Sequence, residues 1–280
     1  MSVEGREQNI RRILVALDAS PHSMAALKAA AELAAQFNAE LLGLYVEDIT
    51  LLRLSELPLA REVSIYSAVP RQITRQEVEQ QLRTQARQAR RAIETLAERL
   101  RVRWSFRVAQ GVIAFELLSA AAESDLILLG KAGWSRRSRL GSTSRTMVSQ
   151  ANRHLMILQH GTRVTPPITL VYDGSPLSKR ALLTTAQLLQ GQDGFLIVVI
   201  LAGEIEKARQ FQAQVAQWLR QQGKQARYRW LVQSDGERLV NTVQSEQCGL
   251  LVLPGESEIL QGDVLEEVIN RMQCPVLVVH

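Results

Sequence analysis

The sequence lacks the marks of several large classes of protein. Among its 280 residues are two cysteines, Cys248 and Cys274, and four scattered histidines without metal-ligand spacing. No apolar run approaches the roughly 20 residues that a membrane helix needs. The polar first residues show no apolar core of a signal peptide. We therefore expect a cytoplasmic protein with reduced thiols, no membrane contact and no assembled metal site.

Charge is present in modest excess. The chain carries 33 basic and 28 acidic side chains, a formal net charge of +5. This balance permits an anionic ligand, but it is too diffuse to indicate nucleic acid as a partner. A hydrophobic fraction of 46% and a charged fraction of 22% are typical of a globular protein. The length allows one large domain or two of ordinary size.

Strand and helix patterns alternate along the first half. Residues 12–17 are a short aliphatic run, and Ser20 and Pro21 then suit the start of a helix over 21–37. A second strand at 40–46 implies a parallel sheet with a right-handed crossover. The elements expected next are a helix at 75–100, a strand at 103–109, a helix at 112–124, a strand at 126–129, a helix at 143–151 and a strand at 154–158.

A repeat follows the linker at 161–167. Asp173-Gly174-Ser175-Pro176 matches Asp18-Ala19-Ser20-Pro21 at an offset of 155. The strands expected after the linker are 168–172, 195–201, 228–233, 249–253 and 275–279, with a helix at 205–222. The chain is therefore two copies of one βαβ-type unit. We expect a first domain at 1–161, which contains an inserted segment at 47–90, and a second domain at 168–280.

One stretch carries the strongest chemical signal. Residues 126–146 read LILLGKAGWSRRSRLGSTSRT, an apolar strand that enters a glycine-containing loop and then a helix. Glycines let a backbone approach a phosphate, and the free N–H groups of a helix start point toward it. Arg136, Arg137 and Arg139 add positive charge. The alternative is an ordinary strand–loop–helix connection with a solvated basic face, because glycine patterns alone are weak signals.

The two halves together resemble the universal stress proteins. The resemblance lies in Asp18-Ala19-Ser20-Pro21 after the first strand, the glycine loop at 130–142, and the last strand at 275–279. It implies an α/β fold of two tandem open parallel five-stranded sheets with helices on both faces, similar to the adenine-nucleotide alpha-hydrolase-like fold. It also implies that the halves pair as an intramolecular pseudo-dimer, with ATP at the carboxyl ends of the strands.

The resemblance also implies a set of binding residues. In the family, the acidic residue after the first strand approaches adenine and ribose, an apolar residue on the second strand contacts adenine, and the glycine loop with its Gly-Ser pair holds the phosphates. The matching positions here are Asp18, Ala19, Val46, Gly130, Gly133, Gly141, Ser142 and Thr143. Seven residues separate Gly133 from Gly141, where the family pattern has nine, so the path of this loop must differ.

The second copy is expected to be inert. In its matching stretch, residues 254–267, Gly255 and Gly262 remain, but no Ser or Thr follows Gly262. Asp263, Glu266 and Glu267 place negative charge where phosphate would lie, which repels it.

The sequence leaves several functions open. The leading hypothesis is a stress-response regulatory protein that binds ATP, with Mg²⁺ brought by the nucleotide and at most slow hydrolysis. The alternative is a scaffold that binds no nucleotide and has a vestigial glycine loop. The partly apolar segment 47–74 is expected to be irregular, and it would be a lid, a protein-partner surface or simple packing on its own sheet. Association of two chains into a homodimer is left open.

Overall fold

The computed structural model describes residues 10–57, 61–63, 70–72, 74–133, 139–190, 195–233, 235–255, 257, 260 and 263–280. Arg136, Arg137 and Gly262, which the sequence analysis named, lie outside these described residues.

The first half follows the expected alternation of strands and helices. Its elements are β1 (Arg12–Leu17), α1 (Pro21–Phe37), β2 (Glu40–Asp48), α2 (Ile49–Ser55), β3 (Arg61–Val63), β4 (Pro70–Gln72), α3 (Arg75–Leu100), β5 (Trp104–Gly111), α4 (Ile113–Ala121), β6 (Leu126–Gly130), α5 (Ser142–Gln150) and β7 (His154–Leu158).

The second half repeats the pattern with fewer elements. They are β8 (Ile168–Tyr172), α6 (Pro176–Leu188), β9 (Leu196–Ala202), α7 (Ile205–Gln221), β10 (Ala226–Val232), α8 (Gly236–Ser245), β11 (Leu250–Pro254), α9 (Asp263–Arg271) and β12 (Val276–Val279).

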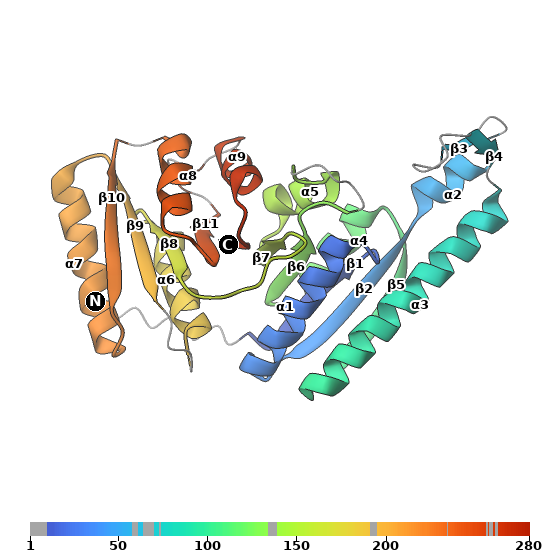
Figure 1. Ribbon diagram of the computed structural model, residues 1–280, viewed down its shortest axis with the longest axis horizontal. Coiled ribbons are helices and arrows are strands. Elements are labelled where there is room, and N and C mark those ends of the chain that lie inside the picture. Colours follow the sequence, from blue (N-terminus) through green and yellow to red (C-terminus); the bar gives the residue numbers. More distant parts are fainter. Residues whose placement is uncertain are drawn as a thin grey trace.

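The two halves share one continuous sheet (Figure 1). The strand order is β10-β9-β8-β11-β12-β7-β6-β1-β2-β5, and each half contributes five parallel strands. The halves meet at β12 and β7, which run antiparallel with Leu277 opposite Met156. Outward from this junction the order of equivalent strands is the same on both sides. The predicted fold class, two parallel five-stranded sheets paired within one chain, is therefore confirmed.

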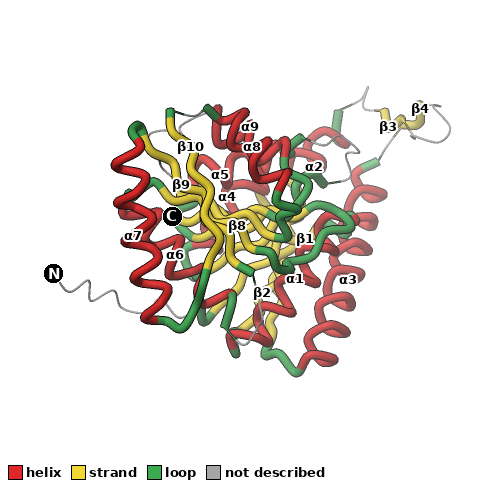
Figure 2. Tube along the Cα trace, turned by 60° about the vertical axis from the view of Figure 1, so that its left-hand side comes forward, coloured by secondary structure: helices red, strands yellow, loops and turns green. Residues whose placement is uncertain are grey.

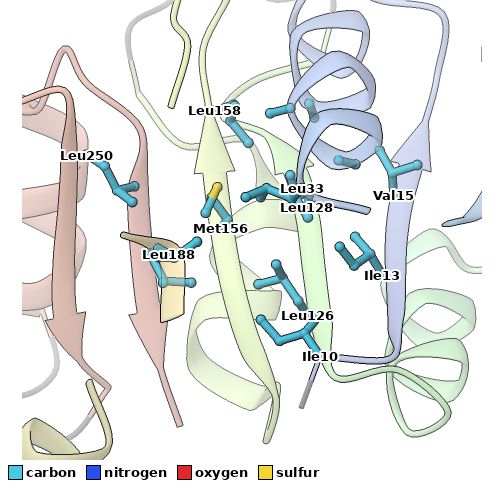
Figure 3. Packing of buried hydrophobic residues seen from close by; sticks show 14 of the residues in the cluster. Ile10, Ile13, Val15, Leu33, Leu126, Leu128, Met156, Leu158, Leu188 and Leu250 are labelled. Carbon is cyan, nitrogen blue, oxygen red and sulfur yellow. The ribbon is translucent and has the colours of Figure 1, made fainter. Parts of the chain in front are cut away.

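Helices cover both faces of the sheet (Figure 2). Buried side chains of α1, α3, α6 and α7 pack on one face, and those of α4, α5, α8 and α9 pack on the other. The first cluster crosses the junction: Met156 on β7 lies between Leu128 on β6 and Leu250 on β11 (Figure 3). Burial of this aliphatic surface is the main force that holds the halves together.

Equivalent caps begin the first helix of each half. The amide of Ser23 donates to the hydroxyl of Ser20 over 3.2 Å, and the amide of Ser178 donates to the hydroxyl of Ser175 over 3.1 Å. A proline occupies the first turn of both helices. Serine as N-cap and proline at the first helical position are favoured because the hydroxyl accepts from one otherwise unpaired amide of the first turn and proline removes another.

The segment after β2 is more regular than expected. The prediction of an irregular 47–74 is wrong for α2, which forms because the Asp48 side chain caps it by accepting from the amide of Thr50 over 2.8 Å. It is also wrong for β3 and β4, which pair antiparallel. In the second half, α7 stands between β9 and β10 as α3 stands between β2 and β5. The element without an equivalent there is α2 with its short β3–β4 pair.

No helix within the described ranges combines the length and the apolar character that crossing a lipid bilayer requires.

Candidate functional site

A cavity of about 270 Å³ lies at the carboxyl ends of β1, β2 and β6. This is the position where open α/β sheets bind ligands, because the loops that leave the parallel strands diverge there. Seven of the eight residues predicted from the sequence line it: Asp18, Val46, Gly130, Gly133, Gly141, Ser142 and Thr143. Ala19 does not line the cavity, although it forms the turn behind Asp18.

One side of the cavity is apolar. Val46 from β2 faces Ile113 and Leu117, which lie one turn apart on α4. Ala16 and Leu44 extend this side toward the core. Sequence reasoning missed the two α4 residues, although their spacing of four on a helix that begins just after Gly111 is a usable signal. The arrangement offers a slot for a flat apolar ring.

Asp18 is fixed by the turn that leads into α1. One of its carboxylate oxygens, Oδ1, accepts from the amide of Ser20 over 2.9 Å. The other, Oδ2, faces Gly133, where an added Cβ would lie 2.8 Å away. The turn requires Ala19 to adopt a left-handed backbone, with φ of 57°. This conformation is unfavourable for a residue with a side chain, and the equivalent position in the second half is Gly174 with φ of 81°.

The fold requires glycine at one position of the loop and not at another. At Gly130, a Cβ would lie 2.8 Å from Cβ of His22 and 3.0 Å from the amide nitrogen of Ser23, so the packing of α1 on β6 demands glycine. At Gly141, the nearest atom to an added Cβ is 3.7 Å away, an ordinary contact. Its φ is −66°, which any residue adopts. The protein itself therefore does not require glycine at 141.

The start of α5 has no side-chain cap among the described residues. Its N-cap is Gly141. The loop is closed behind it by the amide of Gly141, which donates to the carbonyl of Lys131 over 2.9 Å. The hydroxyl of Ser144 donates to the carbonyl of Gly130 over 2.8 Å and ties the helix to the end of β6. The first-turn amides, with the hydroxyls of Ser142 and Thr143, border the cavity as donors.

Lys131 does not join this site. Its Nζ donates to the carbonyls of Asn270 over 2.8 Å and Met272 over 3.0 Å, at the end of α9 in the second half. Burial lowers the pKa of Lys131 to about 8. The amide of Leu140, at the other end of the loop, donates to Oδ1 of Asn270 over 2.7 Å. Both ends of the described loop are thus attached to α9.

The corresponding region of the second half is built differently. Burial raises the pKa of Asp173, but hydrogen bonds with Ser175 and Ser257 outweigh it and hold the pKa below its usual range. The ring of Phe211 lies where a Cβ on Gly174 would be, 2.4 Å away, so an aromatic side chain fills the space beside the turn. At the start of α9, Glu266 pairs with Arg145 of α5 over 2.7 Å.

Metal ligands are not assembled in the part of the chain that the structure describes. No group of three or more His, Cys, Asp or Glu side chains there is arranged to hold an ion.

The chain is similar to one protein family in sequence and to several solved proteins in structure. The family model described as the Universal stress protein family matches residues 9–159. No curated protein matches the sequence. A solved universal stress protein from Archaeoglobus fulgidus is 16% identical, with 96% of this chain and 97% of that chain covered and a TM-score of 0.73. A protein of unknown function from Pseudomonas aeruginosa is 14% identical, with 98% and 93% covered and a TM-score of 0.61. At these identities, the likeness shows a shared fold over nearly the whole chain.

Proposed function

This chain belongs to the universal stress protein family, and from that premise we propose that it is a stress-response regulatory protein whose first half binds ATP. The observation that carries the proposal is the cavity at the ends of β1, β2 and β6, which combines an apolar slot with the uncapped start of α5. Its volume of about 270 Å³ is near the lower end for small-molecule sites. This suits a buried nucleoside whose phosphates extend along the loop.

Each part of the nucleotide has a matching surface in this proposal. The adenine ring lies between Val46 and the α4 pair Ile113 and Leu117, where its burial removes apolar surface from water. A carboxylate oxygen of Asp18 accepts from a ribose hydroxyl. The phosphates lie against the main chain at Gly133 and at the start of α5, where amides and the helix dipole favour negative charge.

Mg²⁺ enters this proposal only with the nucleotide. Mg²⁺ is commonly held by substrate phosphates and retains several waters, so it does not need a protein cage. Among the described residues that line the cavity, none is a nucleophile with a base partner, so binding and regulation, rather than rapid turnover, is the proposed role.

Gly141 provides a direct test, because the fold does not need glycine there. In Gly141→Asp, the carboxylate would stand where the phosphates bind and would repel them. Aspartate is as good an N-cap as glycine or better, so α5 should form normally. We expect calorimetry to show ATP binding by the wild type, weaker binding of ADP and AMP, and a loss of ATP binding in Gly141→Asp at an unchanged thermal midpoint. No ATP binding by the wild type would overturn the proposal.

The proposal extends to the organisation of the chain and its location. The first domain, residues 1–161, carries the binding site, and the second, residues 168–280, pairs with it and binds no nucleotide. Two reduced thiols fit the reducing cytoplasm.

A second candidate function is protein binding through α2. Leu51, Leu54 and Leu57 are 48%, 49% and 56% exposed, a concentration of large apolar side chains that favours a partner surface. We propose a second copy of the chain as its partner. Light scattering should then show a dimer for the wild type and a monomer for Leu51→Gln/Leu54→Gln/Leu57→Gln, with ATP affinity unchanged. A wild type that stays monomeric at high concentration excludes this partner.

A further inference from the structure

The two cysteines of the chain lie side by side at the amino ends of β11 and β12, whereas the candidate cavity lies at the carboxyl ends of β1, β2 and β6. Cys248 comes just before β11 and Cys274 just before β12, and these strands are parallel neighbours with Leu251 opposite Val276. Extended by two residues, this register places Cys274 opposite Gly249, next to Cys248, so the two Cα atoms are about 5–6 Å apart, within the range that a disulfide spans. The two thiols are close enough for each to shift the pKa of the other.

The surroundings give the two thiols different acidities. The hydrogen bond from Cys274 lowers the pKa of Cys248, and the hydroxyl and amide of Thr169 add to this effect against the cost of burial. The same thiol–thiol bond, together with burial, raises the pKa of Cys274. The lower pKa of Cys248 favours its thiolate over that of Cys274 as the nucleophile.

The pair is accessible from solvent. Both cysteines are half-buried and line a cavity of about 630 Å³ beneath the connection between the halves. Arg163 and Pro166 of that connection and Gln273 beside Cys274 border the same cavity. A small oxidant can reach the sulfurs without unfolding of either half.

We propose that Cys248 and Cys274 form an oxidation site that hydroperoxides convert into an intramolecular disulfide. The thiolate of Cys248 attacks one oxygen of the O–O bond, which breaks, and yields a sulfenic acid and hydroxide, or alkoxide from an organic hydroperoxide. The sulfur of Cys274 then attacks the sulfenic sulfur and expels water. With hydrogen peroxide, two thiols and one peroxide give one disulfide and two waters.

The site belongs to the second half alone. By the strand register, Ser124 and Arg153 occupy the corresponding positions of the first half. The disulfide would close a loop that contains the whole of α9, whose end accepts the hydrogen bonds of Lys131. Closing such a loop restricts the unfolded chain and stabilises the folded one.

Peroxide treatment of the reduced full-length protein tests the proposal. We expect both thiols to disappear at the same rate, with the loss of two hydrogen atoms in mass. A single cross-linked peptide pair should contain Cys248 and Cys274, no covalent dimer should form, and the thermal midpoint should rise by several degrees. Persistent thiols, a covalent dimer, or sulfinic acids without a cross-link would overturn the proposal. These outcomes are measured on the wild type, so the test does not depend on any variant.

Two single variants test the order of attack. In Cys274→Ser, the sulfenic acid on Cys248 has no resolving thiol, so dimedone should label Cys248 there and not in the wild type. In Cys248→Ser, Cys274 should react with peroxide at least about tenfold more slowly than Cys248 does in Cys274→Ser, because burial still raises the pKa of Cys274. Dimedone labelling of Cys274 in Cys248→Ser as fast as that of Cys248 in Cys274→Ser would contradict the assignment of Cys248 as nucleophile.

Discussion

Lys131 of the first half donates a hydrogen bond to the main-chain carbonyl of Asn270 in the second half, with 2.8 Å between nitrogen and oxygen. The lysine directly follows Gly130, so the loop that borders the cavity is held in place by a helix of the other half. The second half therefore does more than extend the sheet. It supports the loop through the end of α9, whose carbonyls have no partner within their own helix.

Replacement of this lysine should weaken the whole protein. Lys131→Met keeps the apolar stem but leaves the carbonyls of Asn270 and Met272 without their donor. We expect the free energy of unfolding to fall by about 1–3 kcal/mol, the cost of an unsatisfied buried polar group. Urea denaturation measures this change. Lys207→Met is the matched control on an exposed surface and should stay within about 0.5 kcal/mol of the wild type. Equal effects of the two changes would exclude the bracing role of Lys131.

The turn after the first strand has a left-handed residue in each half, Ala19 in the first and Gly174 in the second. Exchange of alanine and glycine should therefore change stability in opposite directions in the two halves. Ala19→Gly relieves a left-handed alanine, so we expect it to stabilise the protein by roughly 0.5–1 kcal/mol after the entropy cost of glycine. Gly174→Ala should destabilise by about 2 kcal/mol or more, because its φ is positive and the Phe211 ring occupies the space of the new methyl group. Thermal unfolding of both variants decides this, and a stabilised Gly174→Ala would contradict the geometry.

Asp18 and Asp173 occupy equivalent positions, so the same substitution at each shows which half binds ATP. Asparagine keeps the oxygen that accepts from Ser20 or from Ser175, so Asp18→Asn and Asp173→Asn should both fold. Asp18→Asn removes the charged acceptor for the ribose, and we expect about a tenfold loss of ATP affinity. Asp173→Asn should leave the affinity unchanged. Calorimetry measures the ATP affinity of both variants. An equal loss of affinity in both would mean that Asp18 affects ATP binding only through the fold and not through contact with the ribose.

His154 predicts how stability depends on pH. Burial, followed by the positive charges of Arg180 and His280, lowers the pKa of His154 to about 4, below the 6.5 of an exposed histidine. The unfolded chain therefore binds this proton first, and the folded state loses stability as the pH falls from about 6.5 toward 4. Between pH 7.5 and pH 5, we expect His154 to account for a loss of about 2 kcal/mol.

The measurement for His154 is urea unfolding at the two pH values. His154→Gln should show a smaller loss on acidification than the wild type, whereas His160→Gln, at an exposed position, should behave as the wild type does. A wild-type loss that His154→Gln leaves unaltered would show that other groups carry the acid sensitivity.

The sequence was sufficient wherever the cause of structure is local. Apolar runs predicted the strands, and Ser20 and Ser175 with their prolines predicted the two helix starts, because caps act on the next three residues. The constant offset between Asp18 and Asp173 predicted the repeat. The resemblance to the universal stress proteins also predicted seven of the sixteen residues that line the cavity.

The sequence was insufficient where distant segments meet. The direction of Lys131 depends on α9, which is more than a hundred residues away, and the filled space beside Gly174 depends on Phe211 in the next helix. Ile113 and Leu117 were missed because their helix reads as ordinary core. The cap of Asp48 on α2 was a local signal that the apolar segment after it obscured.

The stoichiometry of ATP binding, measured by calorimetry on the full-length chain, tests the central claim most directly. The asymmetry between the open start of α5 and the filled turn beside Phe211 predicts one ATP per chain. Two ATP molecules per chain, or none, would contradict the assignment of the first half as the nucleotide-binding half.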